Sequence, residues 1–525
     1  MVNILFVEDD KALAGAKPVR TLYDGACGTG GMLTVAQEHL RELNPNAILE
    51  VYGQELNAET WAVCRSDLMI KGQDPSRIAL GNSLGSEDGH VGLKVDYCLA
   101  NPPFGVDWNK YADDVLKYAD DSGSKRPPAA DRRDLATSLK YGAGTPRVSD
   151  GSLLFLQHML SKMKPVDDDP STPDIIEGGT RLAIVFSGSP LFSGSAGGGE
   201  SEIRRWIIEN DWLEGIVALP DQLFYNTGIS TYFWVLTNRK PPQRKNKVAL
   251  IDARDSFAKM RRSLGDKRKY IPEEAIAEVT RLYHDALDLD GSDKRVKVFE
   301  REAFGHQRVT VERPLRRVWQ LTSEALHAFT DDKTWAAWAT PTKGHVDPIG
   351  YVHDVEKAQA TLREALVPLT SVEPLTTEKE FAARVKAVAA RIGVRIPEKL
   401  VKALVATAAV ASEHAPVLTD RKGQPLADVD LRDVENVPLP AGWLNLGMDE
   451  REKALLESAQ SHLETEIHSY APDAWLDHSK AKVGFEIPFT RFFYDYVPPR
   501  ELAEIGVELL ATEESIRGLL RGLVR

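Results

Sequence analysis

Short apolar segments alternate with amphipathic ones from about residue 20 to residue 238. The apolar segments are typical of strands buried inside a sheet, and the amphipathic ones are long enough for helices. This alternation predicts an α/β fold in which helices cover both faces of a parallel sheet. The expected strands span 20–24, 48–53, 77–80, 95–99, 181–187, 214–218 and 231–237, and the expected helices span 31–43, 57–70, 151–164 and 200–209.

The spacing of apolar residues becomes helical beyond Ser323, and this region carries no nucleotide-binding or catalytic motif. Helices are expected at 323–329, 353–366, 377–391, 397–411 and 449–469. The last segment places six apolar residues on one heptad stripe, namely Leu502, Ile505, Leu509, Ile516, Leu519 and Leu523. Because three heptads are borderline for a coiled coil, this helix is expected to need a partner surface.

The first residues have a different character. Asn3 to Asp10 resembles the first strand and acidic pair of a response-regulator receiver, but nothing that follows continues that fold. The alternatives are a short edge strand or a foreign start peptide. The segment lacks a basic start and a long apolar core, so it does not resemble a secretory signal.

A glycine-rich turn follows the first expected strand of the sheet. Residues 22–31 read Leu-Tyr-Asp-Gly-Ala-Cys-Gly-Thr-Gly-Gly, and a helix is expected to begin at the end of this run. Gly28, Gly30 and Gly31 allow the backbone to approach a ligand closely where a side chain would clash. The turn alone is a weak nucleotide-binding signal, and the second expected strand, which ends at the acid Glu55, strengthens it.

The most informative stretch is Asn101-Pro102-Pro103-Phe104, at the end of the expected strand 95–99. The Asn101 side chain offers a carbonyl acceptor, and the carbonyl of Pro102 offers another in a turn that the prolines stiffen. Phe104 supplies a ring for stacking. Together these groups suit an exocyclic amine on a flat base. For the two prolines alone, an ordinary proline-rich turn is the alternative.

Composition narrows the possible functions. The chain has 525 residues, of which 42% are hydrophobic and 27% charged, and its net charge is −13. No apolar run is long enough to span a bilayer. Cys27, Cys64 and Cys98 lack metal-type spacing and the histidines are scattered, so we expect reduced thiols, a cytoplasmic location and no metal. An acidic chain would hold DNA poorly unless positive charge is local or a partner holds the duplex.

Local positive charge does occur. Residues 239–269 hold twelve Lys or Arg against three Asp or Glu, which indicates a patch that contacts phosphates; a solvated helix face is the alternative. Residues 108–146 are polar and predict a long loop beside the Asn101 turn. That loop either closes over DNA or is a disordered insertion.

The pair of motifs at 24–31 and 101–104 resembles those of the S-adenosylmethionine-dependent amino-methyltransferases of DNA. The resemblance is strongest to the modification subunits of type I restriction–modification systems. It implies a Rossmann-like methyltransferase sheet followed by a largely helical C-terminal region. The implied division is an atypical segment at 1–16, a catalytic domain at 17–322, and a region at 323–525 for contacts with partner subunits and DNA. Such subunits usually carry a helical domain before the glycine turn, and we do not expect one here, because the turn begins at residue 24 of this sequence.

The resemblance also implies roles for individual residues. S-adenosylmethionine would be the cofactor, with Asp24 near its methionine part, Glu55 on the ribose hydroxyls and Asn82 on the adenine amino group. The expected cofactor-binding residues are Asp24, Ala26, Cys27, Gly28, Thr29, Gly30, Gly31, Glu55 and Asn82, and the expected catalytic residues are Asn101, Pro102, Pro103 and Phe104.

The implied substrate is an adenine flipped out of double-stranded DNA and methylated at N6. The implied partners are a specificity subunit and a restriction subunit, in a complex with two modification subunits. The motif alone also allows cytosine N4, and a protein glutamine methyltransferase uses a similar Asn-Pro-Pro sequence. The rival interpretations are a truncated chain that binds partners without catalysis, and a nucleotide-dependent oxidoreductase on a Rossmann-like sheet.

Overall fold

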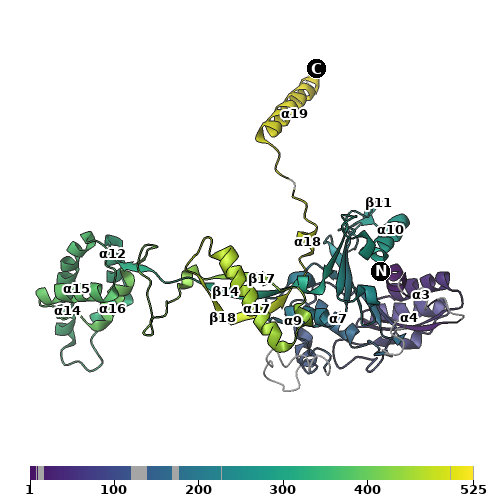
Figure 1. Ribbon diagram of the computed structural model, residues 1–525, viewed down its shortest axis with the longest axis horizontal. Helices are drawn as coiled ribbons and strands as arrows, with labels where there is room; N and C mark the ends of the chain where they lie inside the picture. Colours follow the sequence, from purple (N-terminus) through teal and green to yellow (C-terminus); the bar gives the residue numbers. More distant parts are fainter. Residues whose placement is uncertain are drawn as a thin grey trace. The chain divides into compact units, whose positions relative to one another are not determined.

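The computed structural model describes residues 1–7, 9, 13, 17–119, 139–167, 177–225, 227–496 and 498–523, and the chain folds into two units (Figure 1). The first unit comprises Met1–His306, Pro438–Leu446 and Val483–Arg525. The second comprises Gln307–Val437 and Gly447–Lys482. Over the described residues, no helix combines the length and apolar composition that a membrane span requires.

The first unit is built around a nine-stranded sheet with the order β13-β10-β8-β9-β7-β4-β1-β2-β3. Its strands are β1 (Val19–Asp24), β2 (Ile48–Glu55), β3 (Ile78–Leu80), β4 (Tyr97–Ala100), β7 (Arg181–Ser187), β8 (Leu213–Ala218), β9 (Thr231–Thr237), β10 (Lys247–Asp252) and β13 (Val296–Glu300). The seven strands expected from the sequence are therefore present, each within two residues of its predicted bounds at either end.

The expected α/β sheet with helices is confirmed, but the sheet is mixed rather than parallel throughout, because β9 lies antiparallel between β7 and β8, and β13 lies antiparallel to β10. A parallel crossover between neighbouring strands normally contains a helix. The described residues of 219–230, which connect β8 to β9, contain none, so the chain turns back as an antiparallel strand. The remaining neighbours are parallel, namely β10 with β8 and the series from β7 through β4, β1 and β2 to β3.

The expected helices of this unit are confirmed, at α3 (Gly31–Leu43), α4 (Ala58–Ile70), α7 (Ser152–Leu160) and α9 (Gly199–Glu209). Local sequence explains the start of α4, since the Asn57 side chain accepts hydrogen bonds from the amides of Glu59 and Thr60. The shorter helices are α5 (Ala112–Leu116), α8 (Ser189–Phe192), α10 (Glu273–His284), α11 (Ala286–Leu289) and α18 (Phe489–Phe492), and β5 (Val166–Asp167) pairs with β6 (Glu177–Gly178).

The strand interpretation of the first residues is wrong, because Val2–Val7 forms the helix α1. Val2, Leu5 and Phe6 recur at helical spacing, and all three are buried in the core formed with α3 and β1. The Phe6 ring packs edge-on against Tyr97 of β4, with centroids 4.8 Å apart. The segment is therefore part of the fold of the first unit.

The basic segment 239–269 is also not a helix face. It contains β10 and the two-stranded antiparallel hairpin of β11 (Ala258–Leu264) and β12 (Lys267–Tyr270). The hairpin carries the second half of the positive charge of this segment.

The second unit contains a helical bundle, visible in Figure 1, of α12 (Ser323–Thr330), α13 (Lys333–Trp338), α14 (Pro348–Leu366), α15 (Glu378–Arg391) and α16 (Glu398–Thr407). Its core holds Trp319, Phe329, Leu362, Val385 and Leu404. The helix expected at 397–411 ends earlier, because Ala409–Ala411 forms β16 and pairs with β15 (Arg317–Trp319).

A three-stranded sheet and one further helix complete the described elements of this region. The sheet has the order β17-β14-β18, with β14 at Gly305–Glu312, β17 at Asp433–Pro438 and β18 at Trp475–Phe485. Helix α17 (Met448–His462) shares a core with it through Ala459. The C-terminal helix α19 spans Leu502–Leu523, as its heptad stripe predicts, and Leu502, Leu509 and Leu519 on it are exposed.

Replacing Phe6 by alanine should lower the free energy of unfolding of the first unit by about 3–5 kcal/mol, because a fully buried ring is lost. Urea unfolding followed by hydrogen exchange of β4 peptides measures this change. The matched control is Val35→Ala on the exposed side of α3, which should cost less than about 0.5 kcal/mol. Equal effects of the two variants would show that α1 does not stabilise the sheet.

Candidate functional site

Four neighbouring strands bring four polar side chains to one edge of the sheet. In the parallel series β4-β1-β2-β3, Tyr23 lies beside Cys98, Asp24 beside Gly53, and Glu55 beside Leu80. The carboxyl ends of these strands carry Asn101, Asp24, Glu55 and Asn82, in that spatial order. This is the edge at which open parallel sheets bind ligands.

The register brings the two sequence motifs near one another. Because Tyr23 pairs with Cys98, Asp24 lies beside Leu99, and Asn101 is two residues further along the neighbouring strand. With standard strand spacing and rise, the Cα atoms of Asp24 and Asn101 are roughly 8 Å apart. One ligand of nucleotide size can reach both.

The glycine turn is held in shape by its own polar groups. The Ala26 amide donates to Oδ1 of Asp24 at 2.9 Å, and the Gly28 amide donates to Oε2 of Glu55 at 2.8 Å. Gly28 and Gly30 have φ values of 54° and 82°, a region in which residues with a side chain are strained. The buried Cys27 donates its amide to Gln54, so the turn is fixed to the end of β2.

The glycines of the turn do not share one environment. A Cβ atom added at Gly28 or Gly31 would meet nothing within 4 Å, whereas one at Gly30 would lie 2.7 Å from Sγ of Cys64. Thr29 is exposed between them. Gly30 therefore allows close packing on α4, and the space beside Gly28 and Gly31 is open to a ligand.

Asp24 is buried at the end of β1, and burial raises its pKa to about 7. The amide of Ala26 opposes this increase, and the charge of Glu55 adds to it. A carboxyl in this state gains from a cation that comes close, because the cation stabilises the ionised form. The cause of the increase is the missing water around Asp24.

Glu55 and Asn82 are partly engaged by the chain. Glu55 accepts from Gly28 and also from the Asn57 amide at 2.8 Å, which leaves lone pairs on both carboxylate oxygens. The Asn82 oxygen accepts from the Leu84 amide at 3.0 Å, and the buried Asn82 amide nitrogen has no partner among the described residues. The group that Asn82 leaves unsatisfied is thus a donor, whereas the sequence suggested its oxygen.

The glycine turn packs against the side chains of Tyr23 and His158. Burial lowers the pKa of His158 well below its usual value, so the ring is neutral. The Tyr23 hydroxyl and Nε2 of His158 are hydrogen-bonded at 2.7 Å, and Nδ1 of the same ring lies 3.8 Å from the Asp88 carboxylate. A Cβ atom at Gly25 would lie 3.0 Å from the same ring, so the turn rests directly on His158. Sequence reasoning assigned no role to this histidine.

The Asn101 turn lines a cavity of about 780 Å³, here called the Asn101 cavity. Its lining consists of Asn101, Pro102, Pro103, Phe104, Gly105, Arg147, Ser149, Asp150, Ser187, Ser189, Phe224, Tyr225, Thr227 and Ile229. Asn101 is exposed, and its side chain forms no hydrogen bond with the residues that the structure describes. The glycine turn lies one strand away and is not part of this lining.

Aromatic rings form one wall of the Asn101 cavity. Phe104 packs edge-on against Phe224, with ring centroids 5.6 Å apart and planes at 87°. Phe224 belongs to the connection between β8 and β9. Thr227 lines the cavity, and Asn226 lies outside the described residues.

Arg147 brings a positive charge to the rim of the same cavity. Its guanidinium is half exposed and donates to Oγ of Ser189 at 2.6 Å, while Asp150 lies 3.8 Å away. Ser189 in turn donates to Asp150 at 2.9 Å. Arg147 directly follows the loop 108–146 that the sequence placed beside the Asn101 turn, and residues 120–138 of that loop lie outside the described residues.

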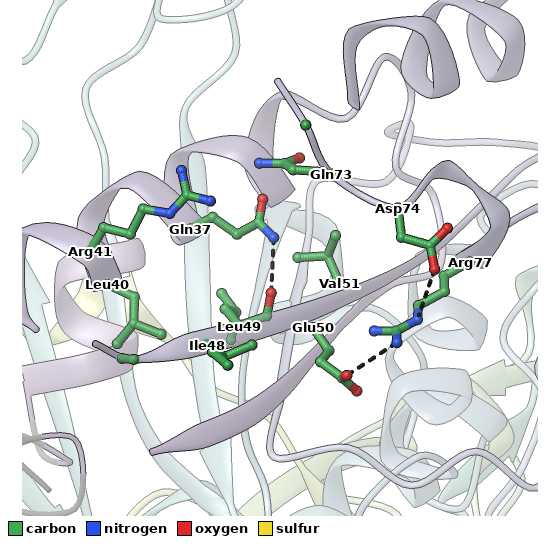
Figure 2. A pocket seen from close by; sticks show the side chains of 12 residues that line it. Gln37, Leu40, Arg41, Ile48, Leu49, Glu50, Val51, Gln73, Asp74 and Arg77 are labelled. Atoms are coloured by element: carbon green, nitrogen blue, oxygen red, sulfur yellow. Dashed lines mark hydrogen bonds and ion pairs between the residues drawn. The ribbon is translucent and has the colours of Figure 1, made fainter. Parts of the chain in front are cut away.

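A smaller cavity, of about 250 Å³, lies between α3 and the start of β2 (Figure 2). Gln37 donates to the carbonyl of Leu49 there, and Arg77 contacts Glu50 at 3.1 Å. Since Leu49 and Glu50 begin β2 whereas Glu55 ends it, this cavity is at the opposite edge of the sheet from Asp24 and Asn101. It is not part of the candidate site.

Comparison with known proteins identifies the family of the chain. The model of the N-6 DNA Methylase family matches residues 10–307, which includes both the glycine turn and the Asn101 turn. The chain belongs to the N-6 DNA methylase family. Nothing in this match depends on the second unit, which lies almost entirely beyond residue 307.

Several relatives of this N-6 DNA methylase are type I restriction enzyme methylase subunits. The MjaVII subunit of Methanocaldococcus jannaschii is 28% identical over 302 residues, which are 57% of this chain and 45% of the relative. The HindI subunit of Haemophilus influenzae is 28% identical over 236 residues, which are 44% of each chain. The chain thus spans less than half the length of these relatives.

A solved structure is also similar. It is the type I restriction-modification system methyltransferase subunit from Streptococcus thermophilus, with 22% identity and a TM-score of 0.41. The alignment covers 58% of this chain and 55% of that one.

Asp24 makes the stability of the ligand-free N-6 DNA methylase depend on pH. The folded chain keeps the Asp24 proton up to about pH 7 and the unfolded chain releases it near pH 4, so the free energy of unfolding falls as pH rises between these values. Asp24→Asn should remove this contribution. Between pH 5 and pH 7 the variant should gain on the order of 2–3 kcal/mol relative to wild type.

Urea unfolding at pH 5, 6, 7 and 8, followed by hydrogen exchange of β1 peptides, measures the difference. The control is Glu59→Gln, which removes an exposed carboxyl and should keep the wild-type dependence on pH. A difference between Asp24→Asn and wild type that is the same at pH 5 and pH 7 would contradict the desolvated state of Asp24.

Proposed function

We propose that this chain is the modification subunit of a type I restriction–modification complex and methylates N6 of adenine in duplex DNA, with S-adenosylmethionine as methyl donor. The observation that carries the proposal is the Asn101 cavity. It presents an unengaged amide and an aromatic wall one strand away from an open glycine turn with a buried acid. Family membership supports the same activity.

The glycine turn fits a nucleoside cofactor with a positively charged tail. The open space beside Gly28 and Gly31 admits the cofactor against bare backbone. The desolvated Asp24 carboxyl would gain from the ammonium group of a methionine tail. Glu55 has lone pairs for ribose hydroxyls, and the unsatisfied Asn82 amide can donate to an acceptor nitrogen of an adenine ring.

When bound, S-adenosylmethionine supplies an electrophilic methyl group on its sulfonium sulfur. Asn101 and Pro102 would act on the substrate instead: the Asn101 side-chain oxygen and the Pro102 carbonyl accept the two N6 protons of the adenine. These hydrogen bonds would draw the amine lone pair out of conjugation with the ring and aim it at the methyl group. The N6–methyl bond would form as the methyl–sulfur bond breaks with its electron pair left on sulfur, and one N6 proton would then pass to solvent. Catalysis then rests on positioning and electrostatics, with no covalent enzyme intermediate.

The Asn101 cavity is large enough for a base that has left the duplex. Extrusion costs a few kcal/mol, which stacking in the cavity has to offset. Phe104 would provide the stacking face, and the edge-on contact with Phe224 holds the Phe104 ring in place. Cys98 and Cys27 are given no part in this chemistry, because burial raises the pKa of Cys98, and a hydrogen bond to Cys64 followed by burial raises that of Cys27.

A methyl-transfer assay tests the proposed function. The full chain, purified with a specificity subunit, is incubated with labelled S-adenosylmethionine and duplex DNA, and the nucleosides are separated. Label in N6-methyladenine supports the proposal. Label only in N4-methylcytosine, or in a protein, would replace the substrate, and no label in any product would favour a chain that binds partners without catalysis.

Asn101→Ala should lower turnover by about 100-fold or more, because it removes an acceptor that acts on the amine in the transition state. Cofactor affinity, measured by calorimetry, should stay within about twofold of wild type, since Asn101 lies one strand away from the glycine turn. The control is Asn109→Ala, an exposed asparagine outside the Asn101 cavity. Wild-type turnover in Asn101→Ala would refute the acceptor role.

The partner subunits are also part of the proposal. The structure describes the side chains of five of the six stripe residues of α19. All five are at least one-third exposed, namely Leu502, Ile505, Leu509, Ile516 and Leu519. Such a stripe needs an apolar partner, and the specificity subunit is the partner that we propose. The proposed complex contains two modification subunits and a restriction subunit and works in the cytoplasm, where the three buried cysteines stay reduced.

Leu509→Asp combined with Leu519→Asp should weaken association with the specificity subunit by about 100-fold or more, because two apolar contacts are lost and charges are buried. Size-exclusion chromatography of the mixed subunits measures association. The control is Ala511→Asp with Gly518→Asp, which adds the same charge to the opposite side of α19. If both pairs of substitutions co-elute with the partner as wild type does, α19 is not the docking element.

A further inference from the structure

The structure divides the basic segment 239–269 into two halves with different roles. In the first half four of the six cations are engaged by the fold: Arg239 contacts Asp9, Lys240 contacts Asp211 and Arg254 contacts Asp252, each at 2.6 Å, and Arg244 is the fourth. Arg244 donates to the carbonyls of Tyr283 and His284. These side chains are not available to a large anion.

The second half is the hairpin of β11 and β12, and its charge is mostly unpaired. Ala258–Tyr270 holds six Lys or Arg against one acid, Asp266, in a chain of net charge −13. Four of these cations are exposed and have no partner among the described residues: Lys259, Arg261, Arg262 and Arg268. The other two, Lys267 and Lys269, contact the Tyr225 ring and Asp221 respectively.

The arrangement of charge carries a local cost. Lys259 lies directly opposite Lys269 in the hairpin, and like charges in that position destabilise a strand pair. Asp221 compensates Lys269, but Lys259 has no such partner. A bound polyanion would relieve this repulsion.

Main-chain hydrogen bonds tie the hairpin to the wall of the Asn101 cavity. The Asp266 amide donates to the carbonyl of Tyr225 at 3.1 Å, and the amides of Arg268 and Lys269 both donate to the carbonyl of Gln222, at 3.0 and 3.2 Å. Tyr225 also lines the cavity. The hairpin is therefore attached to the loop that forms the aromatic wall.

The attachment holds Gln222 in a costly conformation. Its φ is 58°, in the left-handed region where a residue other than glycine is strained. The carbonyl that this conformation presents is the one that receives two hairpin amides. The position of the hairpin beside the Asn101 cavity is thus fixed by specific contacts.

We propose that the β11–β12 hairpin is a phosphate-binding ribbon that grips duplex DNA beside the base held in the Asn101 cavity. This rests on the proposed function, which supplies DNA as the substrate. Unpaired guanidinium and ammonium groups on a two-stranded ribbon suit the phosphates that border a groove. Through this ribbon an otherwise acidic chain binds the phosphates of the target strand without a specificity subunit.

The test is the salt dependence of DNA binding by the full chain. Arg261→Gln, Arg262→Gln and Arg268→Gln together should lower affinity for a 30-base-pair duplex by roughly 10- to 100-fold, and should reduce the slope of log affinity against log salt by about three. Fluorescence anisotropy of a labelled duplex between 50 and 200 mM salt measures both. Calorimetric binding of S-adenosylmethionine should be unchanged, which shows that the variant is folded.

The matched control removes three exposed cations at the opposite edge of the sheet, by Lys17→Gln, Arg41→Gln and Lys245→Gln. These residues precede or flank the starts of β1, β2 and β10, and their loss should leave the slope within about one unit of wild type. An equal loss of slope in both triple variants would overturn the proposal, as would an unchanged slope in the hairpin variant or no binding of duplex by the wild-type chain.

Methyl transfer separates this inference from the proposed function. With DNA at saturation, the hairpin variant should keep kcat within about twofold and show a raised KM for DNA. Methylation with an unaltered salt slope would overturn the role of the hairpin alone. Salt-dependent binding through the hairpin without methylation of any adenine would overturn the proposed function and leave the ribbon as a DNA contact.

Discussion

The parallel order β4-β1-β2-β3 is the constraint on which the site depends. It forces the ends of four strands to one edge, so that Asn101, Asp24, Glu55 and Asn82 become neighbours although they are up to 77 residues apart in the chain. Their carboxylates and amides would otherwise be scattered. The register then fixes the separation of Asp24 from Asn101, and with it the size of the molecule that can bridge the two.

Two kinds of polar group meet at this edge: groups that the fold already uses and groups that remain available to a ligand. Some are used by the fold, as when Glu55 receives the amides of Gly28 and Asn57. Others are left for a ligand: the desolvated Asp24 carboxyl, the unsatisfied Asn82 amide and the free Asn101 side chain. For the two buried groups, Asp24 and Asn82, this carries an energetic cost that a bound ligand can offset, whereas the exposed Asn101 side chain is available at no such cost.

Much of this arrangement could be predicted from the sequence, because glycines, prolines and buried strands act through short-range rules. The strands, the glycine turn and the Asn101 turn were recognisable for that reason. The insertion of β9 between β7 and β8 was not, because it depends on a connection without a helix. The helical form of α1 was not among the alternatives that the sequence suggested, although Val2, Leu5 and Phe6 have helical spacing. Arg147, Phe224 and His158 reach the site only through tertiary folding, and no local pattern distinguishes them. The sequence predicted a positively charged segment at 239–269. Only the structure distinguishes the unpaired cations of the hairpin from the paired cations that precede it.

The central claim is that the glycine turn and the Asn101 cavity form one site. A crystal structure of the full chain with S-adenosylhomocysteine tests it most directly. The account predicts that the adenosine lies along Glu55 and Asn82, the amino acid tail lies at Asp24, and the sulfur faces the Asn101 turn. A ligand whose sulfur faces away from Asn101, with side chains closing the space between it and the cavity, would contradict the account.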